Sequence, residues 1–143
     1  MSGTFHHGCA FGYTEQVLNA LALEDTIPII KRGAVPAQEE AGIRRQRLAD
    51  GSLGAVSLTV LELTMAPGSR IPMHIHPGHE ECMVVLEGAL EWVMGDAKGT
   101  VRAGSTIIVP KDVKHTLLNA TRSPAKFIAI FPTASMQRTL VEP

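Results

Sequence analysis

The sequence predicts an all-β fold: a single small barrel or sandwich of short antiparallel strands, with one short helix near the N-terminus. Two observations carry this prediction. Short runs rich in apolar and β-branched residues are separated by turn residues, and the chain holds 13 glycines and 9 prolines among its 143 residues. Almost no helical periodicity lies between these runs, a combination that is typical of antiparallel sandwiches and barrels.

The N-terminal part of the chain is predicted to contain an irregular arm followed by a short helix. The residues before Thr14 are rich in glycine and lack periodicity. Thr14 is placed to cap a helix over Glu15–Asp25, in which apolar residues recur at helical spacing. Pro28 ends this pattern. We therefore divide the chain into an N-terminal arm and short helix packed on the barrel, residues 1–40, and a barrel domain, residues 41–143.

The strands are predicted from the runs between turn dipeptides such as Pro67-Gly68, Pro77-Gly78 and Gly95-Asp96 and single turn residues such as Gly99. No internal repeat or interdomain linker interrupts the series. The predicted strands are Ile27–Lys31, Ile43–Ala49, Ala55–Met65, Ile71–His76, Glu81–Glu87, Leu90–Met94, Thr106–Val109, Val113–Asn119 and Ala125–Phe131.

Composition and charge argue against several classes of protein. The chain is 45% hydrophobic and 19% charged, as in ordinary globular proteins. A net charge of −1 predicts no general attraction to nucleic acid or to anionic membrane lipid. The sequence shows neither a spanning helix nor the basic-then-apolar layout of a secretion signal. Cys9 and Cys82 are too few for a disulfide framework, so we expect a cytoplasmic protein.

The six histidines are unevenly distributed, and three of them fall within six residues. His74 and His76 are two positions apart in a strand-like run, so both side chains leave the same face of the sheet. An isolated pair of this kind is more often solvent-facing or hydrogen-bonded than metal-binding. Here the carboxylates of Glu80 and Glu81 follow across a Pro-Gly turn, and His115 lies in a separate apolar strand, where unpaired charge is costly. The sequence therefore predicts a metal site, and strand alternation leaves open which of the two glutamates points inward.

Two stretches of the sequence resemble the two motifs of the cupin family. The first motif comprises Gly68, His74, His76, Glu81 and Gly88, and the second comprises Gly104, Pro110, Asp112, His115 and Asn119. The fifteen residues between the two motifs agree with the short spacing of small microbial cupins. Asp112 stands where the family usually has glycine. Aspartate tolerates such turn conformations, so we expect an altered turn and not a lost site.

The resemblance implies a jelly-roll barrel, usually dimeric, with one divalent transition metal ion inside. It implies His74, His76, Glu81 and His115 as metal ligands, because the family's spacing to the second glycine of the first motif selects Glu81 over its neighbour. Three imidazoles and one carboxylate suit Fe, Mn, Ni, Co, Cu or Zn. On an octahedral ion they leave two positions for water, substrate or dioxygen.

Fold alone does not fix the reaction, since similar barrels carry out many. The leading hypothesis is a dioxygenase acting on a small enol, diketone or phenolic substrate, with Glu81 as the catalytic residue that accepts the substrate proton. One alternative is a non-redox lyase or isomerase in which the metal stabilises an enolate. A further alternative is a non-catalytic module that binds a small ligand. In each case we expect a homodimer with a small molecule as its ligand.

Other residues near the predicted site carry weaker expectations. Arg44, Arg45 and Arg47 form the only basic run; a solvated strand face is the favoured interpretation, and an anion contact near the barrel mouth is the alternative. His79 is expected to be exposed, the alternative being a role at the entrance or as an acid or base. An apolar cavity wall would favour a small, mostly apolar substrate with one chelating oxygen function. The candidate wall residues are Met73, Met83, Val85, Ile108, Leu117 and Phe127.

Overall fold

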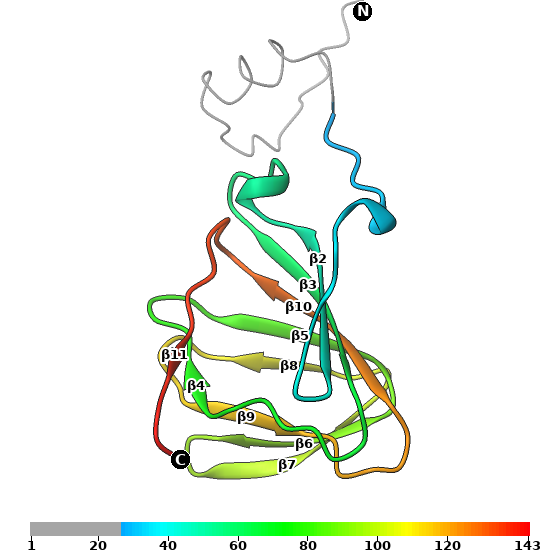
Figure 1. Cartoon of the computed structure of the whole chain (residues 1–143). Helices are drawn as coiled ribbons and strands as arrows, with labels where there is room; N and C mark the ends of the chain where they lie inside the picture. The colour runs from blue at the N-terminus through cyan, green and yellow to red at the C-terminus, as the bar shows by residue number, and fades with distance from the viewer. Residues whose placement is uncertain (1–26) are drawn as a thin grey trace, which may run out of the picture.

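The computed structural model describes residues 27–143 of the chain, and these residues form two antiparallel β-sheets (Figure 1). The helix predicted over residues 15–25 lies outside the described residues. The all-β fold predicted from the sequence is confirmed. Within residues 27–143, no helix combines the length and the apolar character that crossing a membrane requires.

The first sheet has six strands in the order β1-β2-β3-β10-β5-β8. Their bounds are Gln38–Glu40 for β1, Ile43–Ala49 for β2, Thr59–Met65 for β3, Ala125–Phe131 for β10, Glu81–Glu87 for β5 and Thr106–Val109 for β8. The second sheet has five strands in the order β11-β4-β9-β6-β7. Their bounds are Thr139–Leu140 for β11, His74–Ile75 for β4, His115–Leu118 for β9, Ala89–Met94 for β6 and Ala97–Arg102 for β7. Two single-turn 3-10 helices, η1 over Arg32–Ala34 and η2 over Gly51–Leu53, precede and follow the first two strands.

The core between the sheets is built from alternate positions along the strands. In β10 the residues from Ala125 to Phe131 are buried at every second position, as a strand with one face on a core requires. Phe127 and Phe131 are 1% and 2% exposed, and each contributes about 1.5–3 kcal/mol through burial. The same alternation buries Glu81 as the first inward position of β5. A polar site is thus placed at one end of an apolar interior.

The segment before β1 covers part of the outer face of the first sheet. Gln46 and Glu62 are register partners on β2 and β3, and both are buried although they face away from the core. The Gln46 side chain donates a hydrogen bond to the carbonyl of Val35 (2.7 Å), and Arg32 forms an ion pair with Glu62. These contacts hold η1 and its flanking residues on the sheet.

Three strand predictions differ from the structure by three residues or more at one end. Ile27–Lys31 is not a strand: Ile27 and Ile29 are more than four-fifths exposed and have no sheet neighbour among residues 27–143, while Pro28 has no N–H to offer a ladder. The run predicted from residue 55 becomes a strand only at Thr59, and of the run predicted over Ile71–His76 only His74–Ile75 is a strand.

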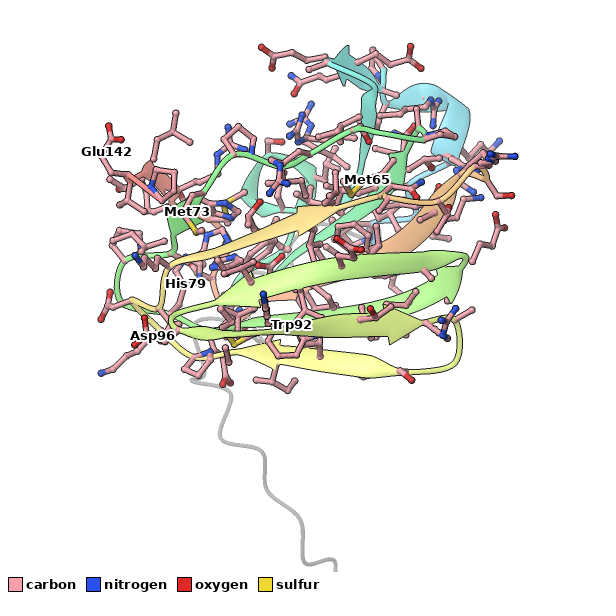
Figure 2. All side chains as sticks on the ribbon, turned by 90° about the horizontal axis from the view of Figure 1, so that it is seen from below. Met65, Met73, His79, Trp92, Asp96 and Glu142 are labelled. Atoms are coloured by element: carbon pink, nitrogen blue, oxygen red, sulfur yellow. The ribbon has the colours of Figure 1, made fainter. Side chains whose placement is uncertain are left out.

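The sequence does not predict β1, β7 or β11, and β7 is missed because Gly99 has the features of a turn residue. Gly99 instead lies opposite Trp92 of β6 in the strand register. A Cβ atom at this position would come within 2.8 Å of the indole ring, so the glycine makes room for the tryptophan. Figure 2 shows Trp92 beside the β6–β7 ribbon, with Asp96 in the turn that joins the two strands.

Candidate metal centre

Four buried polar side chains from both sheets meet inside the barrel. His74 opens β4 and His115 opens β9, and the two residues are paired in the register of the second sheet. Glu81 opens β5 in the first sheet, and His76 follows β4 directly. All four are between 3% and 5% exposed. The structure therefore brings together the four residues that the resemblance implied as ligands.

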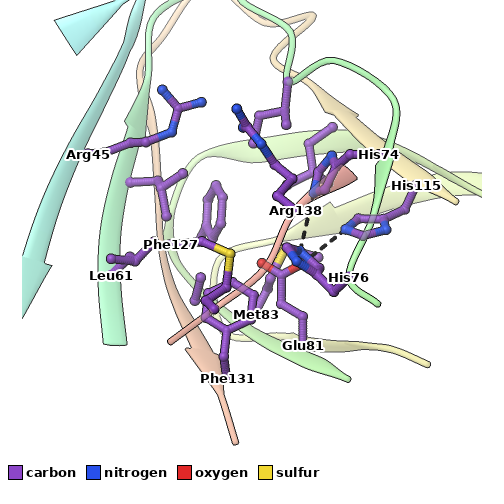
Figure 3. Close-up of a pocket in the computed structure, with 15 residues that line it drawn as sticks. Arg45, Leu61, His74, His76, Glu81, Met83, His115, Phe127, Phe131 and Arg138 are labelled. Carbon is purple, nitrogen blue, oxygen red and sulfur yellow. Dashed lines mark hydrogen bonds and ion pairs between the residues drawn. The ribbon is translucent and has the colours of Figure 1, made fainter. Parts of the chain in front are cut away.

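The ligand atoms of these four side chains converge on one point. All of them lie within 4.8 Å of one another. The Nε2 atoms of His74 and His76 are 3.2 Å apart, and the Nε2 atoms of His76 and His115 each lie 3.1 Å from Oε2 of Glu81 (Figure 3). Metal–ligand bonds of about 2.1 Å place ligand atoms at right angles about 3 Å apart. The group is therefore the right size to bind a transition-metal ion.

The other nitrogen of each ring fixes which way the ring faces. Each Nδ1 atom lies within hydrogen-bonding distance of a backbone carbonyl oxygen. The acceptors are Pro72 for His74 (2.8 Å), Gln137 for His76 (2.6 Å) and Val113 for His115 (2.9 Å). A carbonyl oxygen can only accept, so Nδ1 carries the proton and the lone pair of Nε2 points to the common centre. This is the tautomer that binds a metal.

The charge state of the group also suits a cation. Burial lowers the pKa of His74 to about 4, so this ring is neutral near pH 7. Burial raises the pKa of Glu81, but hydrogen bonds from His115 and His76, which these rings can donate only when Nε2 also carries a proton, outweigh that effect and bring the pKa down to about 2. With neutral rings, lone pairs would face one another and the carboxylate across about 3 Å. A divalent ion at the centre would convert this repulsion into attraction.

The choice between the two glutamates follows from the start of β5. Glu81 is 5% exposed and faces the three rings, whereas Glu80 is exposed on the preceding turn. Among the described residues, only Glu81 brings a carboxylate into the group.

Asp112 connects the two motif regions. Its φ is +61°, in the left-handed region that favours glycine, as expected for a residue at the family's glycine position. Its carboxylate accepts a hydrogen bond from the backbone N–H of Gly78 (2.9 Å), and its own N–H donates to the carbonyl of His76 (3.2 Å). The departure from the family pattern therefore adds a tie to the loop between two candidate ligands.

His79 is half-buried and packs beside the group. Its ring stacks on that of His76, with centroids 5.3 Å apart and planes 26° apart, and meets Phe131 edge-on. Nε2 of His79 accepts a hydrogen bond from the N–H of Gln137 (3.4 Å), the residue whose carbonyl orients His76. Figure 2 shows His79 at the end of the molecule that also carries Met73 and Glu142. The expected fully exposed position is not observed, and the contacts indicate a role in holding His76.

A cavity of about 40 Å³ lies against the candidate ligands. Of the predicted wall residues, Met83, Leu117 and Phe127 line it, and the other three do not. The sequence had not singled out Arg138, which lines the cavity together with Arg45. Arg138 lies far from both motifs along the chain, so the motifs contain no information about it. Arg45 belongs to the basic run, for which the alternative interpretation is an anion contact near the barrel mouth.

Comparisons with known proteins agree with this fold. A sequence-family model described as a cupin domain matches residues 61–131. Protein SchB of Streptomyces halstedii is 32% identical over 115 residues, which cover 80% of this chain and 78% of SchB. Polyketide synthase CurC of Streptomyces cyaneus is 31% identical over 93 residues, 65% of this chain and 60% of CurC.

The solved structure of the polyketide cyclase RemF from Streptomyces resistomycificus superposes with a TM-score of 0.69 at 23% identity, covering 82% of this chain and 87% of RemF. The chain spans less than half the length of the germin-like proteins that it also matches. The barrel, the motif spacing, the family match and the similarity to SchB together show that this chain belongs to the cupin family.

Proposed function

We propose that the protein is a metal-dependent enzyme that acts on a small molecule, with dioxygenation of a small enol, diketone or phenol as the leading reaction. One observation carries the proposal: three Nε2 lone pairs and one carboxylate oxygen converge on a point beside a cavity. These four groups suit Fe, Mn, Ni, Co, Cu or Zn, with one ion per chain. They also leave room in the shell of a six-coordinate ion, as catalytic sites do.

A bound metal would supply a positive centre for an enolate or phenolate oxygen and, if redox-active, a means of using dioxygen. The chain supplies the rest. The backbone carbonyls that accept from Nδ1 hold the rings in place, and Met83, Leu117 and Phe127 exclude water. Glu81 is ionised at neutral pH, and both histidine contacts fall on Oε2. Oε1 is therefore the atom that accepts the substrate proton.

A second reaction class is favoured by the relatives. CurC is named as a polyketide synthase and RemF as a polyketide cyclase. Carbon–carbon bond formation in a cyclase can proceed through an enolate without dioxygen. The same site would then catalyse a non-redox lyase, isomerase or cyclase reaction, with Glu81 again moving the proton.

Elemental analysis of the purified protein tests the metal, and oxygen uptake tests the reaction class. We expect about one metal per chain in the native protein and a large loss of metal in His115→Ala. The loaded protein is then screened against enols, diketones and catechols in an oxygen electrode, with product analysis in air and under nitrogen. Turnover only in air supports the dioxygenase, turnover under nitrogen supports the non-redox enzyme, and binding without turnover supports a ligand-binding module.

We also propose that the chain forms a homodimer. Leu86, Ile108 and Ile130 are between 37% and 50% exposed on the outer face of the six-stranded sheet. Cys82, half-buried and free, lies between Ile108 and Ile130 in the strand register. An apolar surface of this kind is commonly covered by a second copy in symmetric oligomers. A cytoplasmic location stays a prediction from the sequence.

A further inference from the structure

Two arginines stand where the inner cavity meets a larger outer groove. The inner cavity has a volume of about 40 Å³ and the groove a volume of about 680 Å³. Both spaces are lined by Arg45, Leu61, Met136 and Arg138, which we call the neck. Figure 3 shows the side chains of Arg45 and Arg138 together on the side of the cavity away from Glu81. A molecule that approaches the candidate ligands from the groove must pass both guanidinium groups.

In the part of the chain that the structure describes, the neck arginines lack the ion pairs that their neighbours form. Arg44 and Arg47 each form an ion pair with a carboxylate. Within residues 27–143, neither Arg45 nor Arg138 lies within ion-pair distance of any acidic side chain. Within the described residues, two positive charges therefore line the entrance to a buried site without an ion-paired carboxylate, and the charge of Glu40 acts on Arg45 only from beyond ion-pair distance.

The electrostatic repulsion between Arg45 and Arg138 would be relieved by a bound anion. Arg45 is half-buried, and its pKa is lowered first by that burial and then by the charge of Arg138, while Glu40 acts in the opposite direction. Two like charges at a partly desolvated site repel each other. Guanidinium groups bind carboxylates through paired, charge-assisted hydrogen bonds, so an incoming carboxylate would relieve the repulsion.

The size of the inner cavity limits what can lie beyond the neck. A cavity of about 40 Å³ holds on the order of three water molecules. Only the metal-binding end of a substrate fits there, and the remainder of the molecule lies at the neck and in the groove. The groove is mixed in character, since Thr59, Ser135 and the carboxylates of Glu40 and Asp50 line it together with apolar side chains. The part of the substrate outside the inner cavity therefore meets polar as well as apolar side chains.

We propose that the substrate carries a carboxylate, which Arg45 and Arg138 bind at the neck while its keto or enol oxygen reaches the three histidines and Glu81. This inference rests on the proposed function, because it names the substrate class of the same site. It assigns Arg45 and Arg138 to substrate binding and selectivity, apart from the proton transfer at Glu81. The carboxylate also aligns the substrate, since the arginines hold one end of the molecule and the candidate metal centre holds the other.

Calorimetric titration of the zinc-loaded protein with two matched ligands tests the proposal. The ligands are pentane-2,4-dione, a neutral diketone, and 2,4-dioxopentanoate, the same diketone with a carboxylate. We expect the carboxylate to bind about tenfold tighter or better, a preference that weakens as salt is added. The double variant Arg45→Gln/Arg138→Gln should lose the preference. Arg122→Gln, in the exposed turn between β9 and β10, removes the same kind of charge and should retain it.

Equal affinity for the two ligands, no binding of 2,4-dioxopentanoate, or an undiminished preference in the double variant would each overturn the proposal. Zinc content is measured in the same samples. A chain that holds no metal refutes the proposed function and this inference with it. A zinc-loaded chain without carboxylate preference refutes this inference alone, and it leaves the metal-dependent function standing.

Discussion

Acidification of the metal-free protein should destabilise it through His74. This residue is 5% exposed, and its burial lowers the pKa from 6.5 to about 4. Between these values the unfolded chain binds a proton that the folded chain does not, so stability falls as the pH falls. The whole difference corresponds to about 3 kcal/mol, of which about 2 kcal/mol is lost between pH 6.5 and pH 5. The lowered pKa of Glu81 acts in the same direction, but only below pH 4.5.

Urea unfolding of chelator-treated protein at several pH values from 7 to 5 measures this loss. The matched control is His74→Gln, which keeps a polar side chain and cannot titrate. We expect its free energy of unfolding to be lower at pH 7 and to change less with pH, by about 2 kcal/mol over the same interval. Parallel pH profiles for the two proteins would show that His74 is not held neutral by burial, and the account of the site's charge state would then be wrong.

Three further predictions concern the proton acceptor, the turn and the assembly. Glu81→Gln should retain much of the metal but reduce turnover by about 10²–10⁴-fold, and Glu80→Gln, at an exposed position, should alter neither metal content nor rate. Asp112→Ala should lower the free energy of unfolding by about 1–2 kcal/mol, because it removes the acceptor for the Gly78 N–H and leaves alanine in the left-handed region. Asp112→Gly should lower the free energy of unfolding by less in the same urea assay, because glycine adopts that backbone conformation without strain. Ile108→Lys should convert a dimer into a monomer at micromolar concentration by light scattering, and a monomeric native protein would contradict the dimer.

Much of the barrel could be predicted because local sequence patterns identify its strands. Alternation of apolar residues, ended by glycine or proline, marks a strand such as Ala125–Phe131 whatever its partners are. Alternation could not choose between Glu80 and Glu81, because both lie beside a turn, where the phase of the strand is not yet set. The family spacing made the choice, and the burial of Glu81 agrees with it.

The parts that could not be predicted depend on contacts between segments far apart in the sequence. Gly99 resembles a turn residue until Trp92 is placed opposite it. From the sequence alone, Arg45 has the features of a solvated arginine. The structure shows that Arg138, near the C-terminus, lines the same cavity. In each case the meaning of a residue is set by a neighbour that periodicity and local spacing do not reveal.

The C-terminal segment connects the candidate metal ligands to the neck. β11 pairs with β4, so Leu140 lies opposite His74, and the carbonyl of Gln137 accepts the hydrogen bond that orients His76. The next residue, Arg138, lines the neck. The segment that holds two of the candidate ligand rings therefore also brings one of the two positive charges at the neck. Because this segment lies outside both motifs, relatives can keep the four candidate ligands and still differ in the residues that line the entrance to the cavity.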